Sequence, residues 1–413
     1  MAKKTVADID VKGKKILMRV DFNVPLDDNC VITNDKRIVA ALPTIKTILE
    51  KGGSVILMSH LGRPDGEKVA KFSLAPVAKK LSESLGIDVI FANDCIGSDV
   101  KAKAAALKPG QVMLLENVRF YKEEEIKDKK AAEDPALRKA KDDFAKQLAS
   151  LGDVYVDDAF GTAHRDNASM FTVPDMMKGK ARVTGFLVEK ELKFLGDTLN
   201  NPKKPFVAIL GGAKVSDKIK VIENLMKKVD KILIGGAMAY TFFKAKGLTV
   251  GNSLCENEFV DKAKELMATA QRGGCELVLP TDTVISQEIR ASAASKVVAG
   301  NIPDGWQGVD IGPESIKLFV SKLAGAKTVV WNGPMGVFEI EPFDVGTKAV
   351  ALAVAAATDN GATSVIGGGD SASAIKKLGL NKRVSHVSTG GGASLEFMEG
   401  KKFKCLEILD EKG

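Results

Sequence analysis

Short apolar runs alternate with longer helix-patterned segments along almost the whole chain of 413 residues. The runs are apolar nearly throughout rather than alternately apolar and polar, which is typical of parallel strands buried on both faces. The predicted strands are residues 16–20, 55–59, 112–115 and 154–157, then 206–210, 232–234, 277–279, 329–331 and 364–366. The predicted helices include 38–51, 74–85, 215–228 and 259–272.

This alternation of strand and helix occurs twice, which predicts an α/β fold of two doubly wound, Rossmann-like domains with parallel sheets. A helical pattern at 188–199 is followed by two prolines, two asparagines and two lysines at 200–205. We interpret the first as a helix that bridges the domains and the second as a hinge. An ordinary surface loop inside one large sheet is the alternative interpretation.

Composition favours a soluble globular protein, because 45% of the residues are hydrophobic and 27% are charged. The cytoplasm is the default expectation, since no targeting signal is recognised. The longest candidate apolar run, 349–357, is far shorter than the roughly 18 residues that span a bilayer. No secretory signal is expected, since no apolar run follows the first lysines. The five cysteines are dispersed without paired spacing, so neither a disulfide framework nor a zinc site is predicted.

The net charge of +7 favours an anionic partner. The basic residues are spread along the chain, however, and aromatic residues make up only 6% of it. Nucleic-acid binding as the main role needs a basic stretch with interleaved aromatics, which the sequence lacks. Small phosphorylated ligands are therefore the expected partners.

Glycine clusters follow several predicted strands in the second half of the chain. Ligands of open α/β sheets bind beyond the carboxyl ends of strands, where glycine lets the backbone approach a phosphate. The clusters are 211–212, 235–236, 367–369 and 390–392, with Lys214, Lys218 and Asp370 beside them. Each cluster alone also fits tight strand–helix packing, but four in one half indicate a phosphate site. A G-x-x-x-x-G-K-[ST] loop and an early G-x-G-x-x-G are absent, which disfavours a P-loop enzyme and a dinucleotide oxidoreductase.

Basic side chains follow the predicted strands of the first half. Arginine binds phosphate and carboxylate with two parallel hydrogen bonds and keeps its charge, so several arginines at one sheet edge fit a small polyanion. Any one of them could instead be a solvated or capping residue. The set consists of Arg37, His60, Arg63, Arg119, His164 and Arg165.

Eight segments resemble motifs of the phosphoglycerate kinase family, in the family's order and over nearly the whole chain. They are residues 19–25 (RVDFNVP), 59–64 (SHLGRP), 116–120 (ENVRF), 158–165 (DAFGTAHR), 211–218 (GGAKVSDK), 330–339 (VWNGPMGVFE), 367–370 (GGGD) and 388–393 (STGGGA). The resemblance implies a monomeric phosphotransferase that moves a phosphoryl group between 1,3-bisphosphoglycerate and ADP. It also implies domains at 1–187 for the phosphoglycerate and 206–395 for Mg-nucleotide, with 396–413 returning to the first domain and 188–205 as interdomain helix and hinge.

The resemblance also implies roles for individual residues. Those expected to hold 3-phosphoglycerate or the non-transferring end of 1,3-bisphosphoglycerate are Asp21, Phe22, Asn23, Arg37, His60, Leu61, Gly62, Arg63, Arg119, His164 and Arg165. Those expected at the nucleotide are Gly212, Ala213, Lys214, Lys218, Gly235, Gly236, Gly308, Asn332, Glu339, Gly368, Gly369, Asp370 and Ser371. Asp370 is the expected Mg²⁺ residue, and the groups expected to act on the moving phosphoryl group are Arg37, Lys214, Gly367 and Gly390.

Two positions depart from the family pattern. Asn167 stands where the family often has a histidine, which puts any pH-dependent contribution there in doubt. Ser371 replaces a common threonine and keeps the hydroxyl group.

The chemistry needs no general base, because the carboxylate of 3-phosphoglycerate, with a pKa of about 3.5, is ionised at neutral pH. We therefore expect in-line transfer helped by fixed positive charge and by hinge closure, which excludes water. The rival interpretations are a nicotinamide-dependent dehydrogenase and a nucleotide-binding protein without catalytic activity. Stabilisation by NAD, or nucleotide binding without turnover, would favour these rivals.

Overall fold

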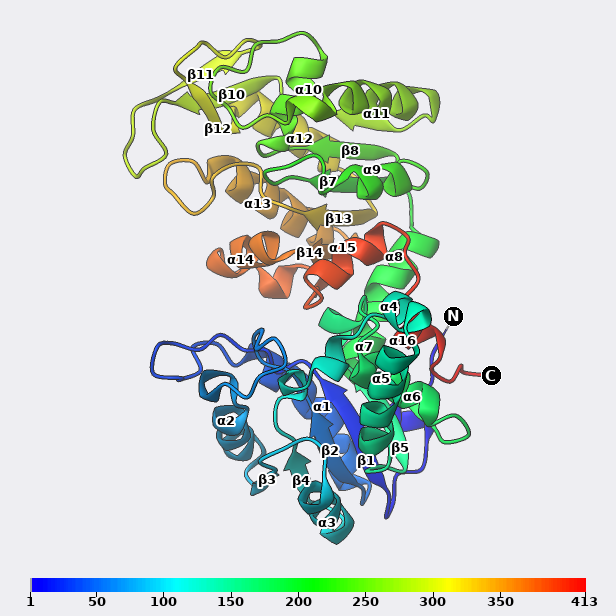
Figure 1. Ribbon diagram of the computed structural model, residues 1–413. Coiled ribbons are helices and arrows are strands. Elements are labelled where there is room, and N and C mark those ends of the chain that lie inside the picture. The colour runs from blue at the N-terminus through cyan, green and yellow to red at the C-terminus, as the bar shows by residue number, and fades with distance from the viewer. Residues whose placement is uncertain (1) are drawn as a thin grey trace. The chain divides into compact units, whose positions relative to one another are not determined.

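The computed structural model describes residues 2–413, which divide into two compact units (Figure 1). The first unit contains the chain up to Leu192 together with Lys402–Gly413, and the second contains Lys193–Lys401. Each unit has a six-stranded sheet whose strands all run parallel. The predicted fold class of two doubly wound parallel sheets is confirmed.

The sheet of the first unit has the strand order β3-β4-β2-β1-β5-β6. Its strands are β1 (Lys15–Val20), β2 (Ser54–Met58), β3 (Val89–Phe91), β4 (Val112–Leu114), β5 (Val154–Asp158) and β6 (Arg182–Thr184). The central strands β1, β2 and β5 are buried along almost their whole length, which is why their sequences are apolar on both faces. Because all six strands are parallel, their carboxyl ends meet at one edge of the sheet.

Helices connect these strands and cover the sheet. They are α1 (Lys36–Glu50), α2 (Ala75–Leu85), α3 (Ser98–Ala106), α4 (Asp128–Glu133), α5 (Pro135–Ala149), α6 (Val173–Met176), α7 (Phe186–Glu191) and α16 (Lys404–Glu407). Local sequence explains their ends. Asp134 accepts hydrogen bonds from two backbone N–H groups at the start of α5, and Gly86 ends α2 with a left-handed φ of 71°.

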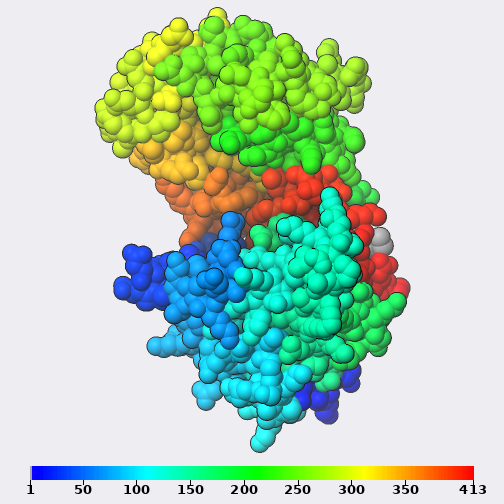
Figure 2. Space-filling model, viewed as in Figure 1, coloured from blue at the N-terminus to red at the C-terminus, as the bar shows by residue number. Residues whose placement is uncertain are grey.

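The last residues of the chain belong to the first unit. The N–H of Lys4 donates to the carbonyl of Asp410 at 2.8 Å, and Lys412 forms ion pairs with Asp8 at 3.1 Å and Glu189 at 3.6 Å. In the space-filling view the exposed end of the chain is drawn in red (Figure 2). The two ends of the chain thus complete one folding unit rather than two.

The sheet of the second unit has the order β15-β14-β13-β7-β8-β9. Its strands are β7 (Phe206–Leu210), β8 (Lys231–Ile234), β9 (Glu276–Val278), β13 (Thr328–Asn332), β14 (Thr363–Gly367) and β15 (His386–Val387). The accompanying helices are α8 (Asp197–Asn200), α9 (Ile219–Leu225), α10 (Met238–Ala245), α11 (Val260–Arg272), α12 (Pro313–Leu323), α13 (Val345–Asp359), α14 (Gly369–Lys377) and α15 (Gly392–Met398). The apolar run 349–357 lies in α13, where Val350, Ala351 and Val354 are buried.

A second, three-stranded sheet in this unit was not predicted. It is antiparallel and consists of β11 (Ser295–Ala299), β10 (Asp282–Ser286) and β12 (Gln307–Ile311), in that order. These strands mix polar and apolar residues, and β11 is largely exposed. A search for continuous apolar runs detects only strands buried on both faces, so it passes over such a sheet.

The helical stretch predicted at 188–199 is observed within α7, a π-helical turn at Leu192–Gly196 and α8. All five cysteines are free. Within residues 2–413, none of the helices combines the length and apolar character needed to cross a membrane.

Candidate active-site residues of the two units

In the first unit, the loop after β1 is hydrogen-bonded to the loop after β2. The N–H of Phe22 donates to Ser59 Oγ at 2.8 Å, and the N–H of Gly62 donates to Asn23 Oδ1 at 2.9 Å. Phe22 itself is buried in the core, so its backbone rather than its ring faces the loops. The carboxyl ends of two neighbouring strands are therefore held together by side chain–backbone contacts.

Arg37 extends from the first turn of α1 and forms an ion pair with Asp21, directly after β1. Its side chain is 39% exposed, whereas that of Asp21 is 12% exposed. A guanidinium group has five N–H donors, so Asp21 can orient Arg37 and leave donors for a ligand.

The turn at Gly62 positions another arginine. Gly62 has a φ of +65°, and a Cβ there would lie 2.4 Å from the ring of Phe72, so only glycine fits. The Gly62 carbonyl accepts a hydrogen bond from Arg119 Nη1 at 2.9 Å. Leu61, before it, is buried. The backbone of this turn thereby fixes the Arg119 side chain.

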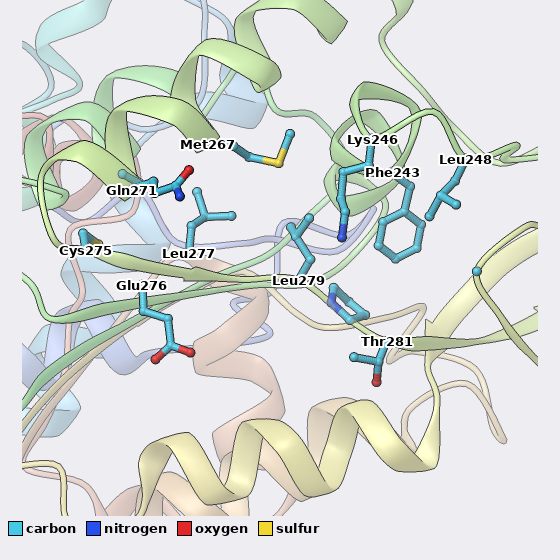
Figure 3. Close-up of a pocket in the computed structure, with 13 residues that line it drawn as sticks. Phe243, Lys246, Leu248, Met267, Gln271, Cys275, Glu276, Leu277, Leu279 and Thr281 are labelled. Carbon is cyan, nitrogen blue, oxygen red and sulfur yellow. The ribbon is translucent and has the colours of Figure 1, made fainter.

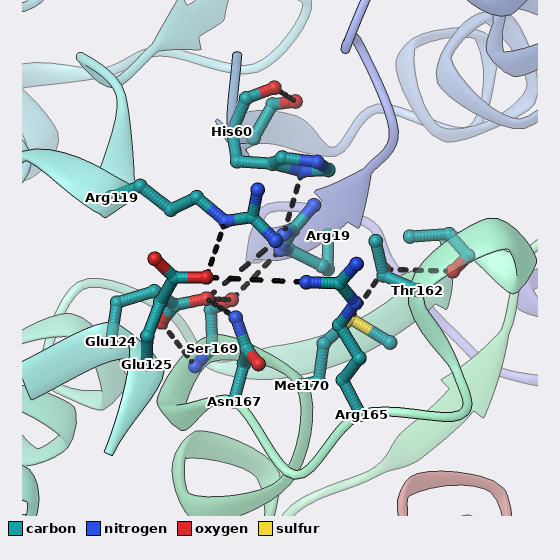
Figure 4. A network of polar contacts seen from close by, with 12 residues as sticks. Arg19, His60, Arg119, Glu124, Glu125, Thr162, Arg165, Asn167, Ser169 and Met170 are labelled. Atoms are coloured by element: carbon teal, nitrogen blue, oxygen red, sulfur yellow. Dashed lines mark hydrogen bonds and ion pairs between the residues drawn. The ribbon is translucent and has the colours of Figure 1, made fainter. Parts of the chain in front are cut away.

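A buried arginine supports His60 from below the site (Figure 4). Arg19 Nη2 lies 3.3 Å from His60 Nδ1, and Arg19 Nε donates to Ser169 Oγ at 2.8 Å. Because arginine can only donate, His60 Nδ1 accepts and the ring proton lies on Nε2. The pKa of His60 is held well below its ordinary value, first by burial and then by the positive charges of Arg19, Arg119, Arg37 and Arg165.

Glu124 is the buried acid beneath this cluster, and its side chain is fully inaccessible. It accepts hydrogen bonds from the N–H of Ser169 at 2.8 Å and from Ser169 Oγ at 2.6 Å. Asn167 Nδ2 also donates to it at 3.3 Å, and Arg19 Nη2 lies 4.0 Å away. The amide of Asn167 is thus part of the buried support, and unlike a histidine side chain it does not titrate near neutral pH.

Glu125 links the remaining arginines. Its carboxylate lies 3.1 Å from Arg119 Nε and 4.0 Å from Arg165 Nη1 (Figure 4). Arg165 Nε also lies 3.4 Å from the ring nitrogen Nε2 of His164. Two arginines from separate loops are therefore held by one acid.

The structure brings most of the residues predicted in the first half into one network. Arg63 is different: it is exposed, and its side chain forms no hydrogen bond or ion pair within the part of the chain that the structure describes. Sequence reasoning did not single out the supporting residues Arg19, Glu124, Glu125 and Ser169. Arg19 had a signal, since it is a charged residue inside the apolar run of β1; the others lie in loops without one.

In the second unit, the glycine turns after β7, β8 and β13 pack directly against one another. The N–H of Gly212 donates to the carbonyl of Pro334 at 3.1 Å, and the N–H of Gly236 donates to that of Met335 at 2.9 Å. A Cβ on Gly236 would lie 2.5 Å from the backbone nitrogen of Gly212. Side chains cannot be accommodated here, so the backbone forms this surface.

A cavity of about 740 Å³ opens at these turns. The predicted residues that line it are Gly212, Ala213, Lys214, Lys218, Asn332, Gly368, Gly369 and Asp370. Gly368 has a φ of +85°, and α14 begins at the next residue, with Asp370 in its first turn. The N–H groups at the start of a helix and its positive dipole end favour an anion.

The two predicted lysines differ in their surroundings. Lys214 is exposed, and its ammonium group has no hydrogen bond or ion pair among residues 2–413. Lys218 is half-buried and donates to Asn332 Oδ1. Burial lowers the pKa of Lys218 to about 8, although the nearby carboxylates of Asp217, Asp370 and Glu399 oppose this shift. Lys218 thus holds a proton that an arriving anion would stabilise.

Other predicted residues lie outside the lining of this cavity. Gly235 and Gly236 lie behind Gly212, Gly308 is on β12 against Tyr240, Gly367 ends β14, and Glu339 is exposed. Ser371 Oγ accepts a hydrogen bond from the N–H of Gly333 at 2.6 Å. The N–H of Gly390 donates to Ser388 Oγ at 3.1 Å. Gly390 and Ser371 therefore make internal contacts in the structure.

The cavity also has charged lining that the sequence reasoning missed. Glu399 and Lys401 belong to it, and Lys401 Nζ lies 3.0 Å from Oε2 of Glu399 and 3.0 Å from Oε2 of Glu396. They directly follow α15. In the sequence alone, charged residues after a helix are interpreted as a solvated helix end, so they were not recognised as cavity lining.

The residues of this cavity fit a divalent cation that is bound by one carboxylate together with a phosphate ligand. No group of three or more His, Cys, Asp or Glu residues suited to a metal occurs in the chain from residue 2 onward, so an all-protein cage is excluded there. Mg²⁺ commonly keeps several waters and binds through one or two carboxylates and substrate phosphates. Asp370, in the lining of this cavity, fits that kind of site.

Comparison with known proteins agrees with this architecture. The family model for phosphoglycerate kinase matches residues 6–401. A phosphoglycerate kinase of Chlorobium phaeobacteroides (strain BS1) is 53% identical over 412 residues, with all of both chains covered. Among solved structures, the phosphoglycerate kinase of Coxiella burnetii has a TM-score of 0.87 at 41% identity, and that of Pyrococcus horikoshii OT3 has 0.80 at 32%, each covering 98% of both chains. The chain therefore belongs to the phosphoglycerate kinase family.

Proposed function

We propose that this family member catalyses reversible transfer of the acyl phosphate of 1,3-bisphosphoglycerate to ADP, which gives ATP and 3-phosphoglycerate. The observation that carries the proposal is that, in each unit, groups suited to binding an anion lie at the carboxyl edge of its parallel sheet. The site of the first unit is rich in arginine, and that of the second is rich in glycine and lysine. Two anionic substrates and two such sites fit a phosphoryl transfer.

In the first unit, the arginine network is the proposed binding site for the phosphoglycerate. Arg37, Arg119 and Arg165 would hold carboxylate and phosphate oxygens, and Asn23 and neutral His60 would supply uncharged hydrogen bonds. Exposed Arg63 has no partner to give up among the residues that the structure describes, so it is proposed to close over the ligand. The carboxylates of Asp21 and Glu125 orient the guanidinium groups and leave some of their N–H donors available for a ligand.

In the second unit, the nucleotide phosphates are proposed to lie in the cavity at the glycine turns. Lys218 would contact the phosphate chain, and Lys214 the phosphoryl group in transfer. The N–H groups at the start of α14 would complete the cradle. Mg²⁺, held with the nucleotide near Asp370, would neutralise phosphate charge.

No side chain is needed to remove a proton, because the attacking oxygen is ionised at neutral pH in either direction. It is a β-phosphate oxygen of ADP when ATP forms and the carboxylate of 3-phosphoglycerate in the reverse reaction. The chain's contribution is position and fixed positive charge around a loose, in-line transition state. Arg37, Lys214 and the backbone N–H groups of Gly367 to Gly369 supply this charge in the proposal. The N–H of Gly390 would contribute by donating its hydrogen bond to a phosphate oxygen in place of Ser388 Oγ.

Because the two substrates belong to different units, transfer requires the units to bring them together. We assign the hinge to residues 188–205, between a first domain at 1–187 and a second at 206–395, with 396–413 returning to the first. Closure would exclude water, which otherwise hydrolyses an acyl phosphate. A cytoplasmic monomer is the state that the family resemblance implies, and we include it in the proposal.

A coupled assay of ATP formation from 1,3-bisphosphoglycerate and ADP tests this function. We expect turnover that requires Mg²⁺ and stops when EDTA is added. Binding of ADP without any ATP formation, in a preparation with a cooperative melting transition, would instead support a nucleotide-binding protein.

A further inference from the structure

A second cavity, of about 630 Å³, lies at the open edge of the parallel sheet in the second unit (Figure 3). Its walls are the end of α10, the last turns of α11, strand β9 and the segment that leads to β10. β9 is the last strand of the sheet, so no neighbouring strand covers this side. None of its lining residues lines the glycine-rich cavity.

Most of the side chains that line this cavity are apolar. Its size lies within the range of about 300–1,000 Å³ that is usual for small-molecule sites, which are mostly apolar with a few placed polar groups. The apolar lining consists of Phe243, Leu248, Met267, Leu277, Leu279 and Pro280. Gln271 and Thr281 supply uncharged polar groups at its margins.

One positive charge at this cavity, that of the exposed Lys246, has no protein partner within the described residues. The ammonium group of Lys246 has no hydrogen bond or ion pair within residues 2–413, whereas its neighbour Lys244 donates to Asn257 Oδ1 at 2.7 Å. Figure 3 shows the Lys246 side chain pointing into the cavity between Phe243 and Leu279. A lysine ammonium group beside apolar side chains is complementary to a ligand that has an anionic group attached to an apolar part.

No negative charge of the lining neutralises Lys246. The carboxylate of Glu276 forms an ion pair with Lys322 and is turned away from Lys246 (Figure 3). Burial raises the pKa of the Cys275 thiol to about 11, so the thiol is protonated at neutral pH. Lys246, an exposed residue, is therefore the one ammonium group of this lining and has no counter-ion within residues 2–413.

We propose that this cavity binds an amphipathic carboxylate, with its anionic head at Lys246 and its alkyl or aromatic body against Phe243, Met267 and Leu279. The proposal concerns a site separate from that of the substrates. Helix α10 begins two residues after the Gly235–Gly236 turn and ends next to Lys246. The two ligands would thus bind in separate cavities without competing.

The test uses the full chain saturated with ADP, Mg²⁺ and 3-phosphoglycerate, so that the substrate sites are occupied. Calorimetric titration with decanoate is compared with decanol, which has the same chain without the charge. We expect one saturable site that prefers decanoate. Lys246→Gln should weaken decanoate about tenfold, as expected for loss of one charged contact, and leave decanol unchanged.

Two further variants complete the test. Met267→Trp narrows the cavity and should weaken binding of both probes, while Lys244→Gln, two residues away and already partnered, should change neither. Unaltered kcat shows that each variant is folded. Absence of saturable binding in the substrate-loaded protein, or decanoate affinity that Lys246→Gln and Met267→Trp leave intact, would overturn the proposal.

Discussion

The Nη2 group of Arg19 lies 3.3 Å from Nδ1 of His60, and both side chains are buried. A permanently charged donor on one ring nitrogen prevents that nitrogen from taking up a proton. His60 therefore enters the site as a neutral hydrogen-bonding group rather than as a charge for the substrate.

This pairing predicts how stability depends on pH. The pKa of His60 is lowered in the folded chain, whereas in the unfolded chain it is about 6.5. Stability from this group is present above about pH 6.5 and is lost as the pH falls, because only the unfolded chain binds the proton. We expect the melting temperature of the wild type to fall more steeply between pH 7.5 and 5.5 than that of His60→Gln. Parallel slopes would contradict the neutral state of His60.

Asp158 makes a prediction of the opposite sign. Its Oδ1 accepts hydrogen bonds from the N–H groups of Leu187 at 2.9 Å and Val188 at 3.3 Å, at the start of α7. Burial raises its pKa to about 7, despite these bonds. The folded chain then holds a proton that the unfolded chain releases at about pH 4, so stability is lost as the pH rises from about 4 to 7.

The variant Asp158→Asn removes this titration and keeps an oxygen acceptor. We expect its melting temperature relative to the wild type to be higher at pH 8 than at pH 5, by several degrees. Circular dichroism melts at the two pH values measure the difference. A difference that does not change with pH would show that Asp158 is ionised throughout.

Lys214 tests the electrostatic part of the mechanism. A donor aimed at transition-state charge contributes about 3 kcal/mol, so Lys214→Ala should lower kcat about a hundred- to a thousandfold. Because Lys214 is exposed and has no partner among the described residues, the melting temperature should not change. Lys227→Ala is the matched control, since Lys227 is an exposed lysine outside the cavity lining. Equal kcat for both variants would remove Lys214 from catalysis.

Lys218 predicts a pH dependence of nucleotide binding. With a pKa of about 8, its side chain is mostly neutral at pH 9 in the free chain, and binding of a phosphate must first restore the proton. The dissociation constant for ADP should thus increase about tenfold per pH unit above the pKa. Lys218→Arg, which keeps its charge, should show little change between pH 7 and 9 by calorimetry. A steep change in that variant too would assign the titration to another group.

Much of the fold could be predicted from the sequence, because strands buried on both faces must be apolar throughout. That rule located β1, β2, β5, β7 and β13 within a few residues. It failed for β10, β11 and β12, whose mixed composition reflects a sheet with an exposed face. It also failed for the two-residue β15, which is too short to give a pattern.

The site was predictable to the extent that parallel strands place their carboxyl ends at one edge. This rule, with the family resemblance, pointed to Asp21, Asn23, Arg37 and Gly62, which the structure brings together. It could not find Glu124 or Lys401, because their positions depend on how distant loops pack. The contacts of Ser371 and Gly390 could not be predicted either. In the structure these residues are hydrogen-bonded to Gly333 and Ser388.

In the proposed mechanism each unit holds one substrate. Titration calorimetry on two matched variants tests this division of the substrates most directly. Arg63 and Lys214 are both exposed and lack side-chain partners in the described chain, so their removal should leave the fold intact. We expect Arg63→Ala to weaken binding of 3-phosphoglycerate and to leave binding of Mg-ADP unchanged, whereas Lys214→Ala should leave binding of 3-phosphoglycerate unchanged. Weaker Mg-ADP binding in Arg63→Ala, or weaker 3-phosphoglycerate binding in Lys214→Ala, would contradict it.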